Sequence, residues 1–253
     1  YVFMATKLGT VKKVPLEQFS KPRSQGLIAL ALDEDDTLIG AAVTNGEQQV
    51  MLFASGGKCA YFEESAVRSM GRTARGVRGM RLAEGESIIS LIIPQEDKLL
   101  LLACENGYGK RTDVSEFTVK GRGVQGVRAI MVNERNGQMV SAIQVDESDD
   151  IMLISDHGTL VRTPVEGISV SGRSAQGVVL IRLGEGEKLA RVERVDDTGS
   201  EEDIEDAELV ENSEGNVEDN GTSSPVNNSA DQEGDSTDND RDAADDESDE
   251  SGS

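Results

Sequence analysis

Four copies of one pattern fill the first 197 residues of this chain, and this repetition limits the possible folds more than any other feature. Each copy carries two glycines at fixed places. The first glycines lie 48, 50 and 51 residues apart, and the second ones 50, 50 and 51. The two sets are Gly9, Gly57, Gly107 and Gly158, then Gly26, Gly76, Gly126 and Gly177. A period near 50 residues is typical of propellers and other repeat folds, and it divides the chain into repeats 2–49, 50–98, 99–150 and 151–197.

Each repeat contains apolar runs of strand length separated by glycine turns, with no sustained 3.6-residue period. This pattern predicts four short strands per repeat. First strands are expected at 2–5, 50–53, 99–103 and 151–154, and second strands at 10–14, 58–62, 108–112 and 159–163. Third strands are expected at 26–32, 76–82, 126–132 and 177–183, and fourth strands at 38–44, 88–93, 139–145 and 188–194. We therefore predict an all-β, propeller-like ring of four-stranded antiparallel blades.

Charge is distributed very unevenly along the chain. The formal net charge is −23, yet residues 196–253 hold 23 acidic side chains and one basic one, which leaves 25 acidic and 24 basic in residues 1–195. The acidic segment is poor in large apolar residues, so we expect a disordered tail at 196–253 after a domain of blades at 1–195. The tail is either a solubilising extension or an internal mimic of DNA. Only the mimic predicts that cutting after Val195 raises DNA affinity at low salt.

Basic residues recur at matching places in the repeats. An arginine stands three or four residues before each second glycine, and further basic residues lie in the same loops or just after the first glycines. A ring that repeats a basic loop on every blade can neutralise the evenly spaced phosphates of a duplex without reading its sequence. The residues expected on this DNA-binding rim are Lys12, Lys13, Lys21, Arg23, Arg68, Arg72, Arg75, Lys110, Arg111, Lys120, Arg122, Arg162 and Arg173. The alternative is a set of solvated loops on a protein-binding propeller.

Motifs that carry catalytic or metal chemistry are sparse. His157 is the only histidine and precedes a turn glycine, Cys59 and Cys104 form no CxxC pair, and neither a GxSxG elbow nor a Walker A loop occurs. Paired carboxylates at 83–86 and 184–187 fall in expected hairpin turns. We expect no catalytic residue, metal site or cofactor in this chain. No apolar run approaches the ~20 residues of a membrane span.

Several segments resemble blades of the C-terminal domain of the DNA gyrase A subunit, part of the type IIA topoisomerase family. These are Val-Phe-Met-Ala-Thr at 2–6 with Gly-Thr-Val-Lys-Lys at 9–13, Gly-Val-Arg-Gly-Met-Arg-Leu at 76–82, Asn-Gly-Tyr-Gly-Lys-Arg-Thr at 106–112 and Gly-Thr-Leu-Val-Arg-Thr at 158–163. The resemblance covers residues 1–195. It implies a β-pinwheel, whose blades exchange a hairpin with their neighbours and whose basic rim wraps duplex DNA. The family disc usually has six blades, so two further blades are expected in the parent protein.

The resemblance also implies a parent complex of two A and two B subunits that introduces negative supercoils with ATP and Mg²⁺ bound outside this chain, in the bacterial cytoplasm at the nucleoid. The catalytic tyrosine is expected upstream, because Tyr1, Tyr61 and Tyr108 occupy blade positions. The family's basic box, close to Gln-Arg-Arg-Gly-Gly-Lys-Gly, is absent, and residues 120–126 are only superficially similar to it. The C-terminal domain of the topoisomerase IV A subunit is an alternative assignment.

Overall fold

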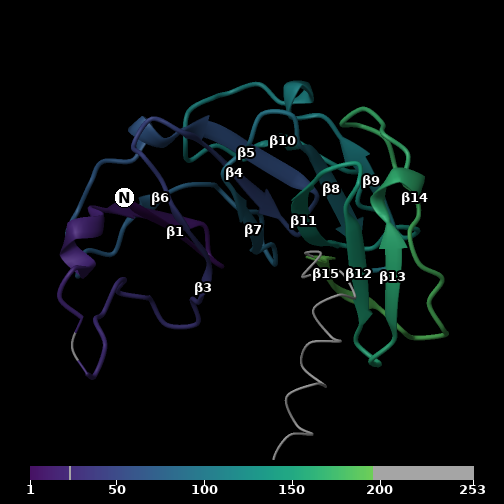
Figure 1. Cartoon of the computed structure of the whole chain (residues 1–253), viewed down its shortest axis with the longest axis horizontal. Coiled ribbons are helices and arrows are strands. Elements are labelled where there is room, and N and C mark those ends of the chain that lie inside the picture. The colour runs from purple at the N-terminus through teal and green to yellow at the C-terminus, as the bar shows by residue number, and fades with distance from the viewer. Residues whose placement is uncertain (23, 196–253) are drawn as a thin grey trace, which may run out of the picture. The chain divides into compact units, whose positions relative to one another are not determined.

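The computed structural model describes residues 1–22 and 24–195, and these residues form four antiparallel sheets that follow one another along an arc (Figure 1). Blade 1 contains β1 (Val2–Thr6), β2 (Thr10–Val14), β3 (Leu38–Val43) and β6 (Val77–Arg78), and blade 2 contains β4 (Gln49–Ala54), β5 (Lys58–Glu63), β7 (Ile88–Ile92) and β10 (Val127–Arg128). Blade 3 contains β8 (Leu99–Cys104), β9 (Tyr108–Thr112), β11 (Met139–Val145) and β14 (Val178–Val179), and blade 4 contains β12 (Asp150–Ser155), β13 (Leu160–Pro164) and β15 (Leu189–Val195). The all-β, propeller-like prediction is confirmed. Arg23 and the acidic segment 196–253 lie outside the described residues.

The outer strand of a blade is supplied by the next repeat. The order in blade 1 is β3-β1-β2-β6, and β6 belongs to the second repeat. In the same way β10 completes blade 2 and β14 completes blade 3. Among the described residues, blade 4 has three strands, in the order β13-β12-β15. The blades therefore exchange strands in one direction along the chain.

The predicted third strands are much shorter than expected. Three of them are two-residue strands (β6, β10 and β14), and residues 26–32 form none. Pairing ends early because the amides of Gly79 and Met80 both donate to the carbonyl oxygen of Gly9, at 2.8 and 3.3 Å, which turns the chain away from β2. The segment 26–32 lacks a partner strand among the described residues. In the later repeats the corresponding segment pairs with the second strand of the preceding repeat.

The hydrophobic core lies between the blades. On β4, Val50, Leu52 and Ala54 face the core shared with blade 1, while Met51 and Phe53 face the core shared with blade 3. The side chains of a strand alternate between the two faces of its sheet, so an interior blade buries both faces and its first strand is apolar over nearly its whole length, as in residues 50–54 of β4. Ile151 and Leu153 of β12 contribute to the core between blades 3 and 4. Strand β13 is half exposed, and Leu160 keeps 62% of its surface accessible.

One-turn 3-10 helices follow the second strands. They are η1 (Leu16–Phe19), η2 (Glu64–Ala66), η3 (Val114–Glu116) and η4 (Val165–Gly167). From η2, η3 and η4 the chain crosses to the preceding blade, where it runs beside the second strand before forming the outer strand. We call these segments, residues 67–76, 117–126 and 168–177, the crossing loops. They lie on the convex side of the arc in Figure 1.

Candidate nucleic-acid interface

Each crossing loop is held to the preceding repeat by backbone hydrogen bonds. The amide of Met70 donates to the carbonyl oxygen of Lys13 at 3.0 Å, that of Lys120 to Tyr61 at 2.7 Å, and that of Ser171 to Arg111 at 2.9 Å. The acceptors occupy the same place in three consecutive second strands. The loops therefore repeat one path from blade to blade, and their side chains recur at matching positions along the convex edge.

The second glycine at the end of a crossing loop allows the close approach. Gly177 has a φ of +84°, and a Cβ atom at this position would lie 2.3 Å from the carbonyl oxygen of Gly109 on β9. A side chain at this residue is disfavoured both by the left-handed backbone and by contact with the neighbouring strand. The regular glycine spacing in the sequence is therefore the signature of docking between repeats.

Three of the repeated arginines bond to the preceding repeat. One terminal guanidinium nitrogen of Arg72 donates to the carbonyl oxygen of Ile28 at 3.0 Å, that of Arg122 to Arg78 at 3.1 Å and that of Arg173 to Arg128 at 3.1 Å. Each acceptor stands two residues after a second glycine, so the three contacts are equivalent. The sequence pattern placed these arginines in the loops but contained no sign of the carbonyl that each one binds.

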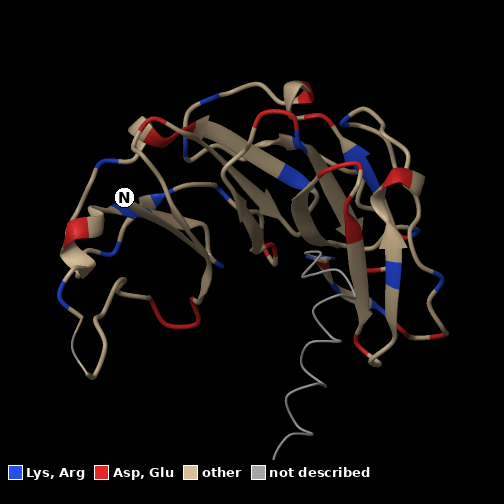
Figure 2. Cartoon of the chain, in the orientation of Figure 1, with Lys and Arg blue, Asp and Glu red and all other residues tan. Residues whose placement is uncertain are grey.

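The loops also carry basic side chains that remain exposed. Arg68, Arg75 and Lys120 are exposed, as is Lys21 in the corresponding loop of the first repeat, and Arg75 forms an ion pair with Asp33 at 2.8 Å. Exposed Arg78 and Arg128 end β6 and β10 and add to this set. Sequence reasoning overlooked them, although the repeated Gly-Val-Arg triplets at 76–78 and 126–128 were visible. Figure 2 shows Lys and Arg in the convex loops, with Asp and Glu of the 3-10 turns among them.

Two predicted rim lysines are buried instead. The ammonium of Lys110 donates to the carbonyl oxygens of Gly172 and Arg173 at 2.7 and 2.8 Å. Lys12 binds the carbonyl oxygens of Ala29, at 2.9 Å, and Arg72. Burial is the main cause that lowers the pKa of both ammonium groups, to about 8 for Lys110. Each of these lysines binds at least one backbone oxygen of the crossing loop in the next repeat. Because both side chains are fully buried, the expectation that they face DNA is corrected.

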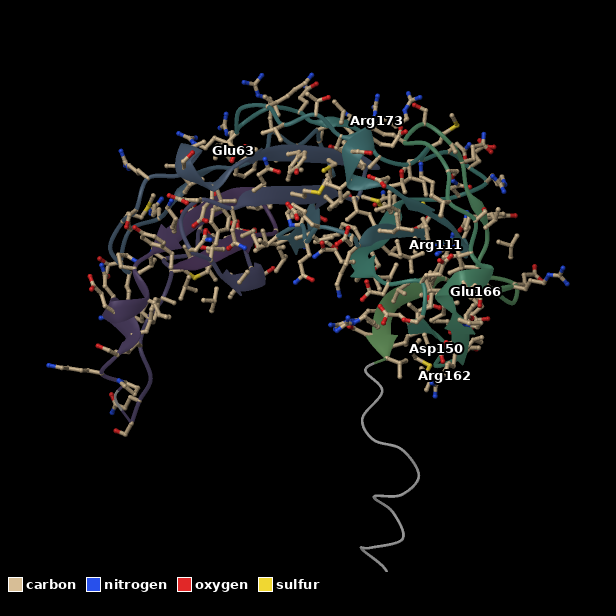
Figure 3. All side chains as sticks on the ribbon, turned by 45° about the horizontal axis from the view of Figure 1, so that its top comes forward. Glu63, Arg111, Asp150, Arg162, Glu166 and Arg173 are labelled. Carbon is tan, nitrogen blue, oxygen red and sulfur yellow. The ribbon has the colours of Figure 1, made fainter. Side chains whose placement is uncertain are left out.

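The basic residues at the next position on β2 and β9 are also buried and bind the following repeat. Lys13 is buried against Glu64, whose backbone oxygen accepts from it at 3.2 Å and whose carboxylate lies 3.8 Å away. Arg111, buried under the fourth repeat, donates to the carbonyl oxygens of Ile168 and Glu166 at 2.5 and 3.2 Å. Figure 3 shows Arg111 farther from the convex edge than Arg173. Lys13 and Arg111 both join consecutive repeats, so we leave them out of the proposed interface.

Arg162 holds the equivalent place in the fourth repeat and is exposed. Its guanidinium pairs with Asp150 on the neighbouring strand β12 at 2.6 Å (Figure 3). Arg23 falls on a residue that the structure does not describe, so its role stays a prediction. Of the thirteen predicted positions, the structure brings Lys21, Arg68, Arg72, Arg75, Lys120, Arg122 and Arg173 to the loops at the surface.

Other polar groups have local structural roles. The carboxylate of Glu187 accepts from the amide of Gly184 at 2.8 Å, and hydrogen bonds, foremost that from the Ser155 hydroxyl, hold the pKa of Glu187 down at about 2. Cys59 and Cys104 are free and buried, and burial raises the pKa of the Cys104 thiol to about 12. Within residues 1–22 and 24–195 no group of three His, Cys, Asp or Glu side chains could hold a metal ion. No helix in this part of the chain is long and apolar enough to cross a membrane.

Comparison with known proteins supports the repeat assignment. The family model of the DNA gyrase C-terminal domain, a β-propeller, matches residues 1–45, 48–95, 98–146 and 149–196. The DNA gyrase A subunit of Pseudomonas aeruginosa is 57% identical over 210 residues, which are 82% of this chain and 23% of that protein. The Escherichia coli subunit is 51% identical over 204 residues, which are 81% and 23% of the two chains. This chain thus spans about a quarter of the length of these relatives.

Two solved structures share the arrangement of blades. A DNA gyrase A C-terminal domain superposes with a TM-score of 0.69 at 28% identity, covering 78% of this chain and 66% of that one. The C-terminal domain of a DNA topoisomerase IV gives a TM-score of 0.73 at 26% identity, covering 84% and 67%. Together with the family model, which matches most of the residues in all four repeats, these similarities show that the chain belongs to the DNA gyrase C-terminal domain family.

Proposed function

We propose that residues 1–195 bind duplex DNA without sequence preference and wrap it along the convex edge of the arc. The observation that carries this proposal is the recurrence of surface cations in three equivalent crossing loops on consecutive blades. A duplex that follows a curved row of Lys and Arg releases its counterions at regular intervals, and this release favours binding for any base sequence. Each blade then adds a similar increment of DNA affinity.

The chemistry of the loops fits phosphate contacts better than base contacts. Arginine and lysine bind phosphate oxygens, and amides of glycine-rich loops can approach the backbone closely. Aromatic residues make up 3% of the chain, so base stacking on an aromatic surface is not expected. The proposed contacts are Lys21, Arg68, Arg72, Arg75, Lys120, Arg122 and Arg173, with Arg78 and Arg128 added from the structure. Arg23 and Arg162 remain candidates.

For the parent protein we infer the role that the names of its relatives suggest. This chain then forms the C-terminal part of a DNA gyrase A subunit that works with two B subunits and a second A subunit in the bacterial cytoplasm, at the nucleoid. The wrapped duplex supplies a crossing segment for ATP-dependent negative supercoiling, and ATP and Mg²⁺ act elsewhere in that complex. The identity to gyrase A subunits supports this assignment over a topoisomerase IV subunit, whose C-terminal domain shares the fold.

The interface is best tested with exposed cations whose side chains make no hydrogen bond to another repeat within the described residues, two in crossing loops and one at the end of β10. We expect the triple variant Arg68→Gln, Lys120→Gln, Arg128→Gln to weaken binding equally for unrelated duplexes. The slope of log K against log salt should fall by about 0.9 for each phosphate that is no longer bound. Fluorescence anisotropy titrations at several salt concentrations measure both quantities.

The matched control removes a cation from the opposite edge of a blade. Arg191 lies on β15, is exposed and pairs with Glu193, so Arg191→Gln should leave the salt slope unchanged. An unchanged slope in the triple variant, with the circular dichroism of the parent chain, would exclude these loops as the interface. A protein-binding propeller predicts no salt-sensitive DNA affinity in any of the chains.

A further inference from the structure

We call residues 26–32, 77–82, 127–132 and 178–183 the outer segments. Together with the crossing loops they form a continuous chain of contacts along the convex edge. The crossing loop of the third repeat contacts the end of the second repeat's outer segment, because the amide of Arg81 donates to the carbonyl oxygen of Val124 at 2.8 Å. Arg122 joins the same two segments through the carbonyl oxygen of Arg78, and Arg173 joins the third and fourth repeats through Arg128. Arg72 makes the equivalent contact to residue 28 of the first repeat. Each junction between consecutive repeats thus contains one such arginine contact.

These arginines have donors to spare. A guanidinium carries five N–H groups in a rigid plane. Arg72 and Arg173 each use one terminal nitrogen on the preceding repeat, and Arg122 also donates its Nε–H to the carbonyl oxygen of Ala66 at 2.8 Å. All four of these bonds lie at the exposed surface. The remaining N–H groups can therefore meet a phosphate while the contact between repeats stays intact.

We propose that Arg72, Arg122 and Arg173 couple DNA binding to the docking of neighbouring repeats, each guanidinium holding a phosphate and the preceding repeat at once. This inference rests on the proposed DNA-binding function. A side chain that is anchored before the duplex arrives loses less freedom on binding than one that moves freely. Coupling is reciprocal, so if the anchor strengthens the phosphate contact, the phosphate must strengthen the anchor. Bound duplex DNA therefore strengthens the docking between neighbouring repeats.

Amide hydrogen exchange reads out docking between the repeats directly. The amides of Gly79, Ala129 and Leu180 donate to the carbonyl oxygens of Gly9, Gly57 and Gly107, each at 2.8 Å, and these bonds exist only when the outer strand of one repeat is docked on the preceding repeat. With duplex present at about one hundred times its Kd, exchange at these amides should slow by up to about 100-fold, because the duplex binds only the docked state. The measurement uses the 253-residue chain and NMR detection.

A charge-preserving substitution separates the anchor from simple attraction to DNA. Arg122→Lys keeps the positive charge but cannot form the planar double contact, so the DNA-dependent slowing at Ala129 should largely disappear while that at Gly79 and Leu180 remains. Lys120→Gln is the matched control. It removes a charge from the same loop, where Lys120 makes no side-chain hydrogen bond to the described residues, and should keep the slowing at Ala129 at equal DNA saturation. If Arg122→Lys does not fold, Arg173→Lys with Leu180 as the reporter replaces it.

The outcomes separate failure of DNA binding from failure of the coupling. Absence of duplex binding by the parent chain in anisotropy titrations would reject the proposed function itself. Binding without slower exchange at the three amides, or full slowing at Ala129 in Arg122→Lys, would overturn the coupling and leave the interface standing. Slowing that is lost only at the amide beside the substituted arginine supports the coupling.

Discussion

Strands β9 and β13 hold the same place in the third and fourth repeats, and their surroundings differ in one respect. The crossing loop of the fourth repeat covers β9, whereas among the described residues nothing pairs with the outer edge of β13. The side chain of Arg111 on β9 is 4% exposed and that of Arg162 on β13 is 59% exposed. The comparison teaches that a basic residue at this position is a structural contact when a following repeat covers it and a surface charge when none does.

The largest effect is expected from a substitution that displaces the fourth repeat from β9. Gly177→Ala places a Cβ atom against the carbonyl oxygen of Gly109 and forces a left-handed backbone on alanine. We expect a loss of about 2–3 kcal/mol in unfolding free energy, from the backbone strain and the displaced strand. Gly26→Ala is the matched control. Gly26 has a similar φ of +76°, but no described atom lies within 4 Å of the place that a Cβ would take, so only the strain of about 1 kcal/mol should remain.

Urea titrations followed by circular dichroism measure both glycine variants against the parent chain. Docking across β9 is refuted as the reason for Gly177 if the two substitutions lower the unfolding midpoint equally.

The next prediction compares the two arginines themselves. Arg111→Met removes hydrogen bonds to two carbonyl oxygens beneath the fourth repeat and should cost about 2 kcal/mol of unfolding free energy. Arg162→Met removes an exposed ion pair and should cost less than about 1 kcal/mol. The same urea titrations measure the difference. A larger loss for Arg162→Met than for Arg111→Met would contradict the structural role assigned to β9.

A smaller effect appears in the pH dependence of stability. The pKa of Lys110 is about 8 in the folded chain against 10.5 in the unfolded one, mainly through burial, with Glu116, Arg173 and Cys104 as the charged or titratable neighbours. Between these values the unfolded state holds more protons, so this residue raises stability as pH increases. Relative to Lys110→Met, the parent chain should gain about 1 kcal/mol between pH 8 and 9. Urea titrations at the two pH values test this, and an opposite sign would refute the burial of the charged form.

Much of the fold was predictable because the glycine spacing reflects contacts that repeat. The period and the apolar runs indicated four propeller-like blades, and the structure confirms them. Sequence reasoning was wrong about the length of the third strands, since a run such as 126–132 shows apolar character but not where the ladder ends. Figure 1 places β10, the paired part of that run, on the second blade rather than the third.

The candidate site was harder to predict than the fold. Repeat position identified Arg72, Arg122 and Arg173 as equivalent residues, and the structure shows equivalent contacts. The same logic grouped Lys12 and Lys110 with them, because a sequence shows that a residue recurs but not which neighbouring repeat covers it. Arg78 and Arg128 escaped notice because they follow the glycine instead of preceding it. The repeat period and the charge pattern therefore predict which loops are basic. Which of the basic side chains can reach a ligand depends on their burial, and the sequence does not show this.

Exchange of the outer strand gives the array of repeats a polarity. No continuous stretch of about 50 residues contains the whole of blade 1, 2 or 3, because the strand that completes each of these blades lies in the following repeat. Deleting or duplicating one full period would preserve every internal match between donor and acceptor, since each junction uses the same pattern of glycine and carbonyl contacts. The number of repeats in such an array can therefore change in whole modules without altering the contacts at the junctions that remain.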